Sequence, residues 1–470
     1  MRQLFVIATR KMEKKVSSFN RANLKKTINY FKRNGIKNTL YTVLERCAQK
    51  GESYSYIPPK ENTLNEQRSY PFEEPCKFSI LVPAYETKET YLRELTDSCL
   101  RQSYSDFELI IADASESACV EQVMKTYADE RVVYKRLTEN KGISGNTNEA
   151  LKIATGDYVG LLDHDDLLTE DALYEMARAI ERGKKDGIEI PMLYSDEDKC
   201  DGEGKVFFDP HKKTDFNLDL LLSNNYICHF TVMKRELMEQ LKFREDYDGA
   251  QDYDIILRGV AALLKKEGYV KTKEQLICHI PKILYHWRCH EASTAINPES
   301  KRYAYEAGKM AVTAFLDSMG WKAKVEHSCH LGFYEVEAED VFDGFGKVGA
   351  VGGKVIDRQN KIAGNLWQEG KKPLEGVHVH FSGYMNRASL KQTMDILDLR
   401  CIRINPELRE LFEEITGMKY TETNGFFAGE EYKKSEAEWS ALSKAFCGEV
   451  QKRGYRLIFY PQYVYKIRKK

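Results

Sequence analysis

Apolar runs that are typical of β-strands alternate with helix-like stretches between residues 76 and 166. KFSILVPAY, FELIIAD, RVVYKRL and YVGLLD are apolar and strand-like, and helical spacing appears between them near Leu92–Leu100, Val120–Ala128 and Asn146–Ala154. Strands that alternate with helices form a parallel sheet whose two faces the helices cover. The sequence therefore predicts an α/β domain, in which ligands bind at the carboxyl ends of the strands.

The length and charge of the chain narrow the class of protein. Its 470 residues are too many for one ordinary domain and favour two or three. A hydrophobic fraction of 42% is enough for a substantial core. Lysine and arginine number 71 against 72 aspartates and glutamates, so the charges nearly cancel. The charge of the whole chain therefore predicts neither a nucleic-acid nor a membrane partner.

Cysteine usage and hydropathy indicate the compartment. The chain has 11 cysteines and no Cys-x-x-Cys pair, which argues against a zinc ribbon or a redox dithiol. Scattered free thiols fit a reducing compartment. No apolar run approaches the roughly 20 residues that span a bilayer, and the apolar stretch in MRQLFVIATRK is too short for a secretory signal. We expect a cytoplasmic protein.

Changes in composition predict four segments. Residues 1–50 are helix-like and carry 13 lysines and arginines against two acids, and residues 51–75 hold four prolines and read as a linker. The α/β domain is expected over residues 76–325 and a second region over residues 326–470. Two interpretations of the basic segment stay open: peripheral contact with an anionic inner membrane face, worth about 1 kcal/mol per basic residue, or a solvated or domain-packing helix.

The sequence LLDHDD places three carboxylates, Asp163, Asp165 and Asp166, at the end of a predicted strand. Such close charges repel one another unless a cation lies between them or one is protonated. Mg²⁺ and Mn²⁺ prefer oxygen ligands and often bridge carboxylates to phosphates. The alternative is an acidic turn whose last two acids cap a helix. The position after an apolar strand favours the metal site.

Three further acids follow apolar segments. Asp113 ends FELIIAD, where it can accept hydrogen bonds from a base or a ribose, although aspartate is also common in turns. Asp252 and Asp254 lie at the expected helix start in GAQDYDIILR. Either is a candidate general base for a reacting hydroxyl. The alternative is that these acids compensate the helix dipole.

The segment ILYHWRCHEAST carries His286, Arg288 and His290 at a period of two, with Trp287 between them. Alternation along a strand would place the three polar side chains on one side. We expect Arg288 to contact a diphosphate and His286 to serve as a metal ligand, with Trp287 as an apolar wall. The alternative is that these side chains are structural, as single histidines usually are.

The run from SILVPAYE through ELIIADAS, ENKGISGNTNEAL and ATGDYVGLLDHDD resembles glycosyltransferase family 2, whose fold is GT-A, over about residues 77–300. YSDEDK, GAQDYD and HIPKILYHWR resemble a bacterial subgroup that builds rhamnose-rich cell-wall polymers and O-antigens. The resemblance implies transfer with inversion from a UDP- or dTDP-linked sugar to a glycan or lipid-linked acceptor. It also implies Mn²⁺ or Mg²⁺ as the cofactor.

The resemblance also implies roles for single residues. Asp163 and Asp165 match the metal-and-ribose acid pair. Asp252 matches the base, with Gln251 in place of the family's first acid and Asp254 as the fallback. Asp113 matches the acid that reads the nucleotide base, with Ala114 in place of a second acid. The remaining donor contacts match the first nucleotide loop and the segment that flanks the diphosphate: Pro83, Ala84, Tyr85, Glu86, Asn140, Gly142 and Asn148.

The C-terminal region shows a weaker resemblance to the acceptor half of a second family 2 domain. GKVGAVGGKVID, HVHFSGY, NPELRELFEEITG and RGYRLIFYPQYVYKI carry it, and no nucleotide-binding half precedes them. The family's Asp-x-Asp would fall on Ser443 and Ala445, so both acids are missing. We expect a degenerate, non-catalytic half-domain that packs on the first domain, forms homo-oligomers or holds a glycan chain.

Two other functional classes are alternatives to an active transferase. A non-catalytic scaffold of the same fold is disfavoured because Asp113, Asp163, Asp165 and Asp252 are all present. A nucleotidyltransferase that makes the sugar nucleotide would need a glycine- and arginine-rich phosphate loop near its first strand. No such loop follows ILVPAY.

Overall fold

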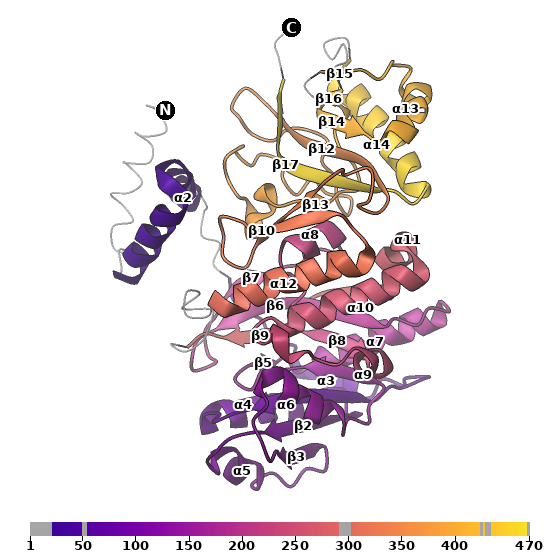
Figure 1. Cartoon of the computed structure of the whole chain (residues 1–470). Coiled ribbons are helices and arrows are strands. Elements are labelled where there is room, and N and C mark those ends of the chain that lie inside the picture. Colours follow the sequence, from indigo (N-terminus) through magenta and orange to yellow (C-terminus); the bar gives the residue numbers. More distant parts are fainter. Residues whose placement is uncertain (1–20, 49–53, 291–301, 424–425, 428–433, 468–470) are drawn as a thin grey trace.

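The computed structural model describes residues 21–48, 54–290, 302–423, 426–427 and 434–467. Figure 1 shows a main sheet with its helices, a C-terminal region stacked on it, and the N-terminal helix α2 (Arg21–Ala48) beside the C-terminal region. Among the described helices, none combines the length and the apolar character that crossing a membrane requires.

The main sheet has nine strands in the order β3-β2-β1-β4-β8-β6-β9-β5, and β7 pairs with β6. The strands β1 to β4 pair in parallel, whereas β8 is antiparallel to both β4 and β6. In order along the chain, the strands are β1 (Phe78–Ala84), β2 (Phe107–Asp113), β3 (Val132–Arg136), β4 (Tyr158–Leu161), β5 (Leu167–Leu168), β6 (Met192–Cys200), β7 (Phe207–His211), β8 (Thr231–Lys234) and β9 (Ile277–Arg288).

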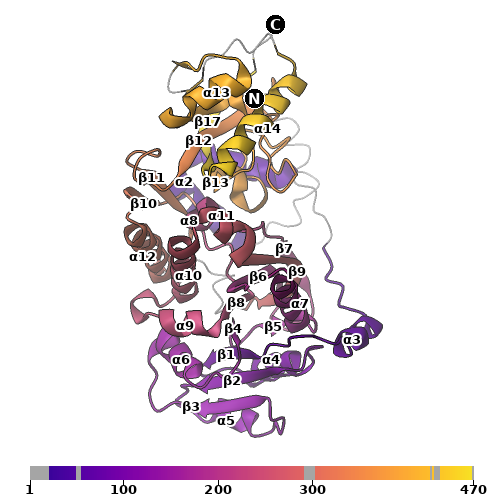
Figure 2. The ribbon, with the colours of Figure 1, turned by 90° about the vertical axis from the view of Figure 1, so that its right-hand side faces the viewer.

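Helices cover both faces of this sheet, as Figure 2 shows. Side chains alternate along β1, so Leu81 joins one core while Ile80 and Val82 join the other. The first core is closed by α6 (Gly142–Leu151), α9 (Arg235–Leu241), α10 (Gln251–Glu267) and α12 (Arg302–Met319), and the second by α4 (Glu89–Leu100), α5 (Cys119–Met124) and α7 (Ala172–Lys185). The predicted α/β architecture is confirmed.

Short elements connect the main sheet to its surroundings. The segment predicted as a linker contains α3 (Glu61–Arg68), and its Tyr54 hydroxyl donates to Asp198 over 2.6 Å. The other short elements of this part are α8 (Leu218–Ser223), the 3₁₀ turn η2 (Glu245–Tyr247), α11 (Tyr269–Lys271) and the π-turn η3 (Thr272–Leu276).

The C-terminal region is built on a four-stranded sheet in the order β13-β17-β12-β14, with its own hydrophobic core. Two separate pairs, β10–β11 and β15–β16, flank it. Its elements are β10 (Ala323–His327), β11 (Tyr334–Ala338), β12 (Val348–Ile356), η5 (Tyr384–Ser389), β13 (Gln392–Thr393), η6 (Leu399–Cys401), β14 (Ile402–Ile404), η7 (Pro406–Leu408), α13 (Arg409–Thr416), β15 (Glu422–Thr423), β16 (Phe426–Phe427), α14 (Glu436–Lys452) and β17 (Arg456–Lys466).

Buried polar contacts join this region to the main domain. The Arg456 guanidinium pairs with Asp219 of α8 over 2.7 Å, and both side chains are buried. The Thr393 hydroxyl also donates to Asp219. Removing one partner of a buried ion pair leaves an uncompensated charge, so these contacts fix the position of the C-terminal region.

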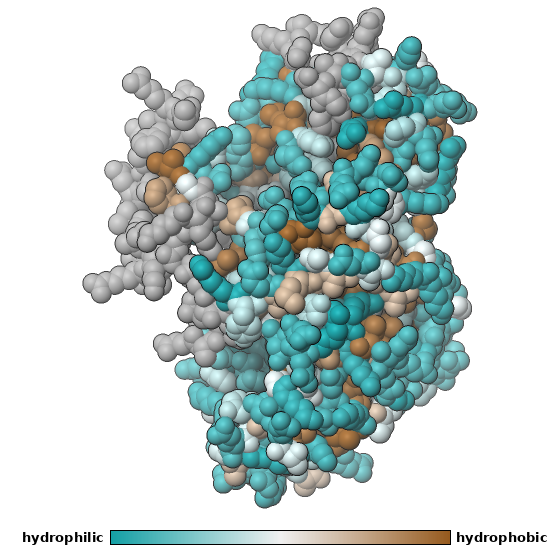
Figure 3. Space-filling model, viewed as in Figure 1, coloured by the Kyte–Doolittle hydropathy of each residue, from teal (hydrophilic) through white to brown (hydrophobic). Residues whose placement is uncertain are grey.

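The helix α2 packs on the C-terminal region. The Glu45 carboxylate accepts hydrogen bonds from the backbone amides of Ser382 and Gly383 over 2.9 and 2.7 Å, and the Tyr41 ring lies 4.5 Å from that of His380. Residues 1–20 of the predicted basic segment lie outside the described residues. On the face that Figure 3 shows, hydrophobic residues form scattered patches on a largely hydrophilic surface.

Candidate active site

A cavity of about 500 Å³ lies beside the ends of β1 and β4. Asp163, His229 and Asp252 are part of its polar lining, and Pro83 and Trp287 are part of its apolar lining. Two other cavities, of about 610 and 620 Å³, are lined by both the main domain and the C-terminal region, and the acids at 163–166 and 252 do not line them. The smaller cavity is therefore the one that carries candidate catalytic groups.

A tight turn after β4 gathers the three acids of LLDHDD. The amide of Asp166 donates to the carbonyl of Asp163 over 3.1 Å, which folds the turn back on itself. Asp166 is fully buried and accepts hydrogen bonds from the Tyr285 hydroxyl (2.5 Å) and the Arg288 amide (2.7 Å). Burial, and then the charges of Asp165 and Asp163, raise the pKa of Asp166 well above its ordinary value. The three carboxyl groups thus crowd negative charge into one turn, and a bound cation would neutralise that charge.

The donor atoms around this turn suit a divalent ion. Ligand atoms of Asp163, Asp166 and His229 all lie within 4.8 Å of one another. Asp165 pairs separately with His290 over 2.7 Å. Carboxylate oxygens with imidazole nitrogens are ligands that Mn²⁺ accepts. The residues present therefore fit a divalent metal, and the Asp163 carboxylate is common to the predicted ligand pair and to the group that the fold brings together.

His229 is oriented by Glu197. Its Nδ1 donates to Glu197 over 3.0 Å, while its Nε2 lies 3.9 Å from an Asp163 oxygen. Burial alone would lower the pKa of His229, but the neighbouring Cys228 and Glu197 raise it well above its ordinary value. Nε2 therefore faces the charge of Asp163, and a metal ion bound at this nitrogen would require it to be unprotonated.

Asp252 and Asp254 point to different surroundings because residues two apart on a helix are roughly 200° apart around its axis. Asp252 lines the cavity and accepts hydrogen bonds from Asn225 (2.7 Å) and the Cys228 thiol (3.5 Å). Asp254 is buried and forms ion pairs with Arg244 and Arg258. The fallback base thus lies in a structural ion-pair group outside the cavity lining.

Side chains alternate along β9 with the predicted period of two. The side of the strand that faces the cavity, however, is not the one that carries His286 and Arg288. Trp287 lines the cavity, and the Tyr285 hydroxyl contacts Asp166. His286 instead bonds to Asp198 over 2.5 Å, so the fold does not bring it to the other predicted metal ligands. Arg288 is fully buried, where its Nε donates to the Asp165 carbonyl over 2.6 Å. Arg288 therefore holds the acidic turn from behind rather than facing the cavity.

The sheet brings the two predicted nucleotide segments together. Ala84 of β1 pairs in register with Asp113 of β2. Asp113 is fully buried and accepts hydrogen bonds from Tyr134 (2.7 Å) and Arg136 (2.9 Å). In the first loop, Pro83 lines the cavity, Tyr85 is exposed, and the Glu86 carboxylate accepts hydrogen bonds from Ser117.

The predicted diphosphate segment forms the start of α6. The Asn140 side chain accepts a hydrogen bond from the Gly142 amide over 3.1 Å. Gly142 has a φ of +72°, and a Cβ there would lie 2.2 Å from an Asp248 oxygen, so only glycine fits. Asn148 makes two 2.8 Å hydrogen bonds to the backbone of Phe243. Asn148 therefore fastens the loop that carries Asp248, a residue of the cavity lining.

Sequence reasoning missed His229, Glu197 and Tyr285 at this site. His229 is a lone histidine in ICHF, and no local pattern distinguishes it. Glu197 lies in YSDEDK, which holds three acids in a row. Buried acids need partners, so this cluster is a signal from which Glu197 could have been found.

Residues 79–242 match the sequence profile of the family described as Glycosyl transferase family 2. The chain contains a family 2 glycosyltransferase domain. The mixed sheet of this glycosyltransferase domain, with parallel strands followed by antiparallel partners, is a GT-A fold, so the predicted fold class is confirmed.

Several curated proteins resemble part of the chain. The uncharacterized protein y4gI of Sinorhizobium fredii is 38% identical over 244 residues, which are 51% of this chain and 25% of that protein. The O-antigen biosynthesis protein RfbC of Myxococcus xanthus is 33% identical over 251 residues, 53% of this chain and 18% of that protein. The amylovoran biosynthesis glycosyltransferase AmsB of Erwinia amylovora is 30% identical over 194 residues, 38% of this chain and 63% of that protein. The chain thus spans a quarter or less of the first two relatives.

Among solved structures, Staphylococcus aureus TarS 1–349 in complex with UDP aligns with a TM-score of 0.38 and 19% identity. The alignment covers 51% of this chain and 65% of TarS 1–349. The mannosyltransferase PcManGT of Pyrobaculum calidifontis, in complex with GDP-Man and Mn²⁺, aligns with a TM-score of 0.34 and 16% identity over 55% of this chain and 79% of that chain.

Proposed function

We propose that the glycosyltransferase domain moves a sugar from a nucleoside-diphosphate sugar to a glycan or lipid-linked glycan, in bacterial surface polysaccharide synthesis. One observation carries the proposal: a single cavity is lined by both Asp163 of the acidic turn and Asp252 at the start of α10. Transfer needs a positive charge at the leaving diphosphate and a base at the acceptor hydroxyl. Both requirements have candidate groups in this cavity.

In the proposed reaction, Asp252 takes the proton of the acceptor hydroxyl. The acceptor oxygen forms a bond to the anomeric carbon while the bond from that carbon to the diphosphate oxygen breaks. Attack from the face opposite the diphosphate inverts the configuration of that carbon. Asn225 supports this role because it donates to Asp252 over 2.7 Å and so orients the carboxylate.

The proposed cofactor is Mn²⁺ or Mg²⁺, since GT-A glycosyltransferases commonly use a divalent metal. Asp163 is the ligand that we propose first, with Asp165, Asp166 and His229 as the other donors near it. When bound, the ion stabilises the departing diphosphate as a Lewis acid. His286 is not part of this proposal because its ring bonds to Asp198.

The proposed donor is a UDP- or dTDP-linked sugar. Pro83 and the start of α6 border the cavity and are proposed to contact it. Asp113 and Asn148 are proposed to act mainly by holding their loops, since both make hydrogen bonds within the protein. A role in surface polysaccharides is supported by similarity to proteins of O-antigen and amylovoran biosynthesis.

Donor binding can be tested by thermal unfolding with a panel of nucleotide sugars and Mn²⁺. At about 100 times its dissociation constant, a ligand that binds only the folded state raises the free energy of unfolding by roughly 2.7 kcal/mol. We expect such a shift from a UDP- or dTDP-sugar, and we expect it to be lost with a chelator. Stabilisation that is the same with and without Mn²⁺ would contradict the proposed metal.

We propose that residues 326–470 support the first domain without catalysing transfer. Ser443, at one position of the missing acid pair, is buried and accepts a hydrogen bond from the Leu399 amide. Ser443 therefore acts in packing. This region is also proposed to form a homo-oligomer interface or to hold a glycan chain. Light scattering tests the first role, and glycan binding tests the second.

Peripheral contact with the inner membrane face is proposed for the basic N-terminal segment. Glu45 and Tyr41 attach α2 to the C-terminal region, whereas Gly35–Asn38 are exposed. We expect the full chain to co-sediment with anionic vesicles more than with neutral ones, and we expect removal of residues 1–50 to abolish the difference. Equal sedimentation with the two vesicles would leave only the domain-packing interpretation.

A further inference from the structure

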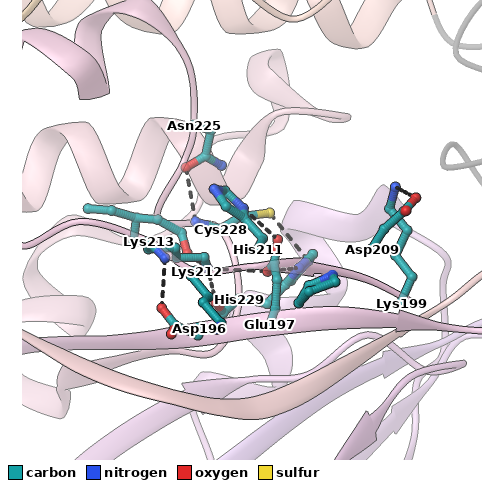
Figure 4. A network of polar contacts seen from close by, with 12 residues as sticks. Asp196, Glu197, Lys199, Asp209, His211, Lys212, Lys213, Asn225, Cys228 and His229 are labelled. Carbon is teal, nitrogen blue, oxygen red and sulfur yellow. Dashed lines mark hydrogen bonds and ion pairs between the residues drawn. The ribbon is translucent and has the colours of Figure 1, made fainter. Parts of the chain in front are cut away.

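Glu197 of β6 is a buried acid with three cationic or imidazole partners. Its carboxylate accepts hydrogen bonds from His229 Nδ1 (3.0 Å), Lys213 Nζ (3.2 Å) and His211 Nδ1 (3.3 Å), as Figure 4 shows. Burial alone would raise the pKa of Glu197, but Lys213 and the two histidines hold it well below its ordinary value. Glu197 is therefore a fixed negative charge beneath the cavity, and the proposed reaction gives it no role so far.

The contact with Glu197 decides which nitrogen of His229 faces the cavity. Because an ionised carboxylate only accepts hydrogen bonds, Nδ1 must carry a proton. Nε2 is left to face the cavity side, where it lies 3.4 Å from the Cys228 sulfur and 3.9 Å from an Asp163 oxygen. The His229 ring also stacks on Tyr285, with centroids 4.5 Å apart and an interplanar angle of 8°. Tyr285 in turn donates to Asp166. The imidazole is thus fixed from two sides.

Lys213 balances the charge of Glu197 and shapes the same loop. Its side chain is fully buried, and its ammonium donates to the carbonyls of Ile227 and His229 in addition to Glu197. Neutralising Glu197 would leave this ammonium as a buried, uncompensated cation beside the His229 backbone. Glu197 therefore affects both the ring and the backbone of His229.

We propose that Glu197 is a positioning residue that directs His229 Nε2 toward the acidic turn and so sets the affinity of the site for a divalent ion. This inference rests on the proposed function. Histidines that bind metals usually donate their other ring N–H to a carboxylate, and loss of that partner typically costs about 10–100-fold in metal affinity or activity. Glu197 acts through His229 and does not itself face the substrate.

The next residue on β6 offers a matched control. Asp198 is also buried and also bonds to a histidine, His286, over 2.5 Å. Because side chains alternate along a strand, this second pair lies on the opposite side of the sheet from Glu197. Tyr54 and Tyr56 pack against it, and it does not line the cavity. The Asp198 pair therefore reports what loss of a buried carboxylate–imidazole contact does to stability alone.

The test is to titrate the full chain with Mn²⁺ by calorimetry, alongside thermal unfolding and donor kinetics. For Glu197→Gln we expect Mn²⁺ affinity to fall about 10–100-fold, with kcat largely restored at saturating Mn²⁺. For Asp198→Asn we expect unchanged Mn²⁺ affinity with reduced thermal stability. Glu197→Asp keeps the charge on a shorter side chain, so its Mn²⁺ affinity should lie between those of the parent and Glu197→Gln. This variant replaces Glu197→Gln in the test if Glu197→Gln does not fold.

A double-mutant cycle separates positioning from a general structural effect. If Glu197 acts through His229, Glu197→Gln should reduce Mn²⁺ affinity in the parent and add little to His229→Ala. Equal Mn²⁺ affinity in the parent and in Glu197→Gln would overturn the role of Glu197 while leaving the proposed function intact. Absence of Mn²⁺ binding in the parent itself would overturn both proposals.

Discussion

Asp252→Asn is expected to lower sugar transfer by at least about 100-fold, the loss that follows removal of a general base. The carboxylate lines the cavity and is oriented by Asn225, so an amide of the same shape keeps the surroundings but takes no proton. Donor binding should change little, because Asp252 acts on the acceptor. The measurement is the transfer rate at saturating donor with Mn²⁺, together with donor affinity by calorimetry.

Asp254→Asn is the matched control on the same helix. This substitution breaks ion pairs with Arg244 and Arg258. Because both guanidiniums reach solvent, the loss of stability should be smaller than the roughly 3–5 kcal/mol that follows from breaking a fully buried pair. We expect a lower unfolding temperature and an unchanged turnover per folded molecule. If Asp252→Asn transfers sugar as fast as the parent and Asp254→Asn does not, the base has been assigned to the wrong acid.

Asp163→Asn is expected to remove metal-dependent donor binding. Asp163 lies within 4.8 Å of the ligand atoms of Asp166 and His229 and belongs to the predicted acid pair with Asp165. Loss of a residue hydrogen-bonded to a metal ligand lowers metal affinity roughly 10–100-fold, and loss of a direct ligand should lower it further. The measurement is the affinity for a nucleotide sugar with Mn²⁺ and with a chelator. We expect Asp165→Ala to abolish the Mn²⁺-dependent part as well.

An exposed acid on the same sheet controls for the charge change. Asp209 of β7 pairs with Lys199 at the surface, away from the cavity. Asp209→Asn should leave donor affinity unchanged with and without Mn²⁺. Unchanged calorimetric affinity for Asp163→Asn and Asp165→Ala would show that the acidic turn does not hold the metal.

The strand-like runs SILVPAY, FELIIAD and YVGLLD predicted the parallel half of the sheet correctly because strands buried on both faces are apolar throughout. The insertion of β8 between β4 and β6 could not be predicted in this way. Strand order depends on which surfaces pack together, and no local run of residues encodes that choice.

The candidate site shows the same division. The acids at 163–166 and Asp252 were found because strand ends and helix starts are visible in sequence. Alternation along β9 predicted that His286 and Arg288 share a side of the strand. Which side faces the cavity depends on how β9 pairs with the neighbouring strand β6. The opposite side carries Trp287, which lines the cavity, and Tyr285, whose hydroxyl contacts Asp166. His229 was missed because its role comes from contacts with Glu197 and Asp163, which are distant in sequence.

The most direct test of the proposed function is the release of nucleoside diphosphate from a panel of nucleotide sugars, with a glycan acceptor and Mn²⁺. We expect the parent to release it from a UDP- or dTDP-linked sugar. We expect a chelator to abolish the release and Asp252→Asn to lower its rate by at least about 100-fold. Release that continues unchanged with the chelator and in Asp252→Asn, or no release from any nucleotide sugar, would contradict the proposal.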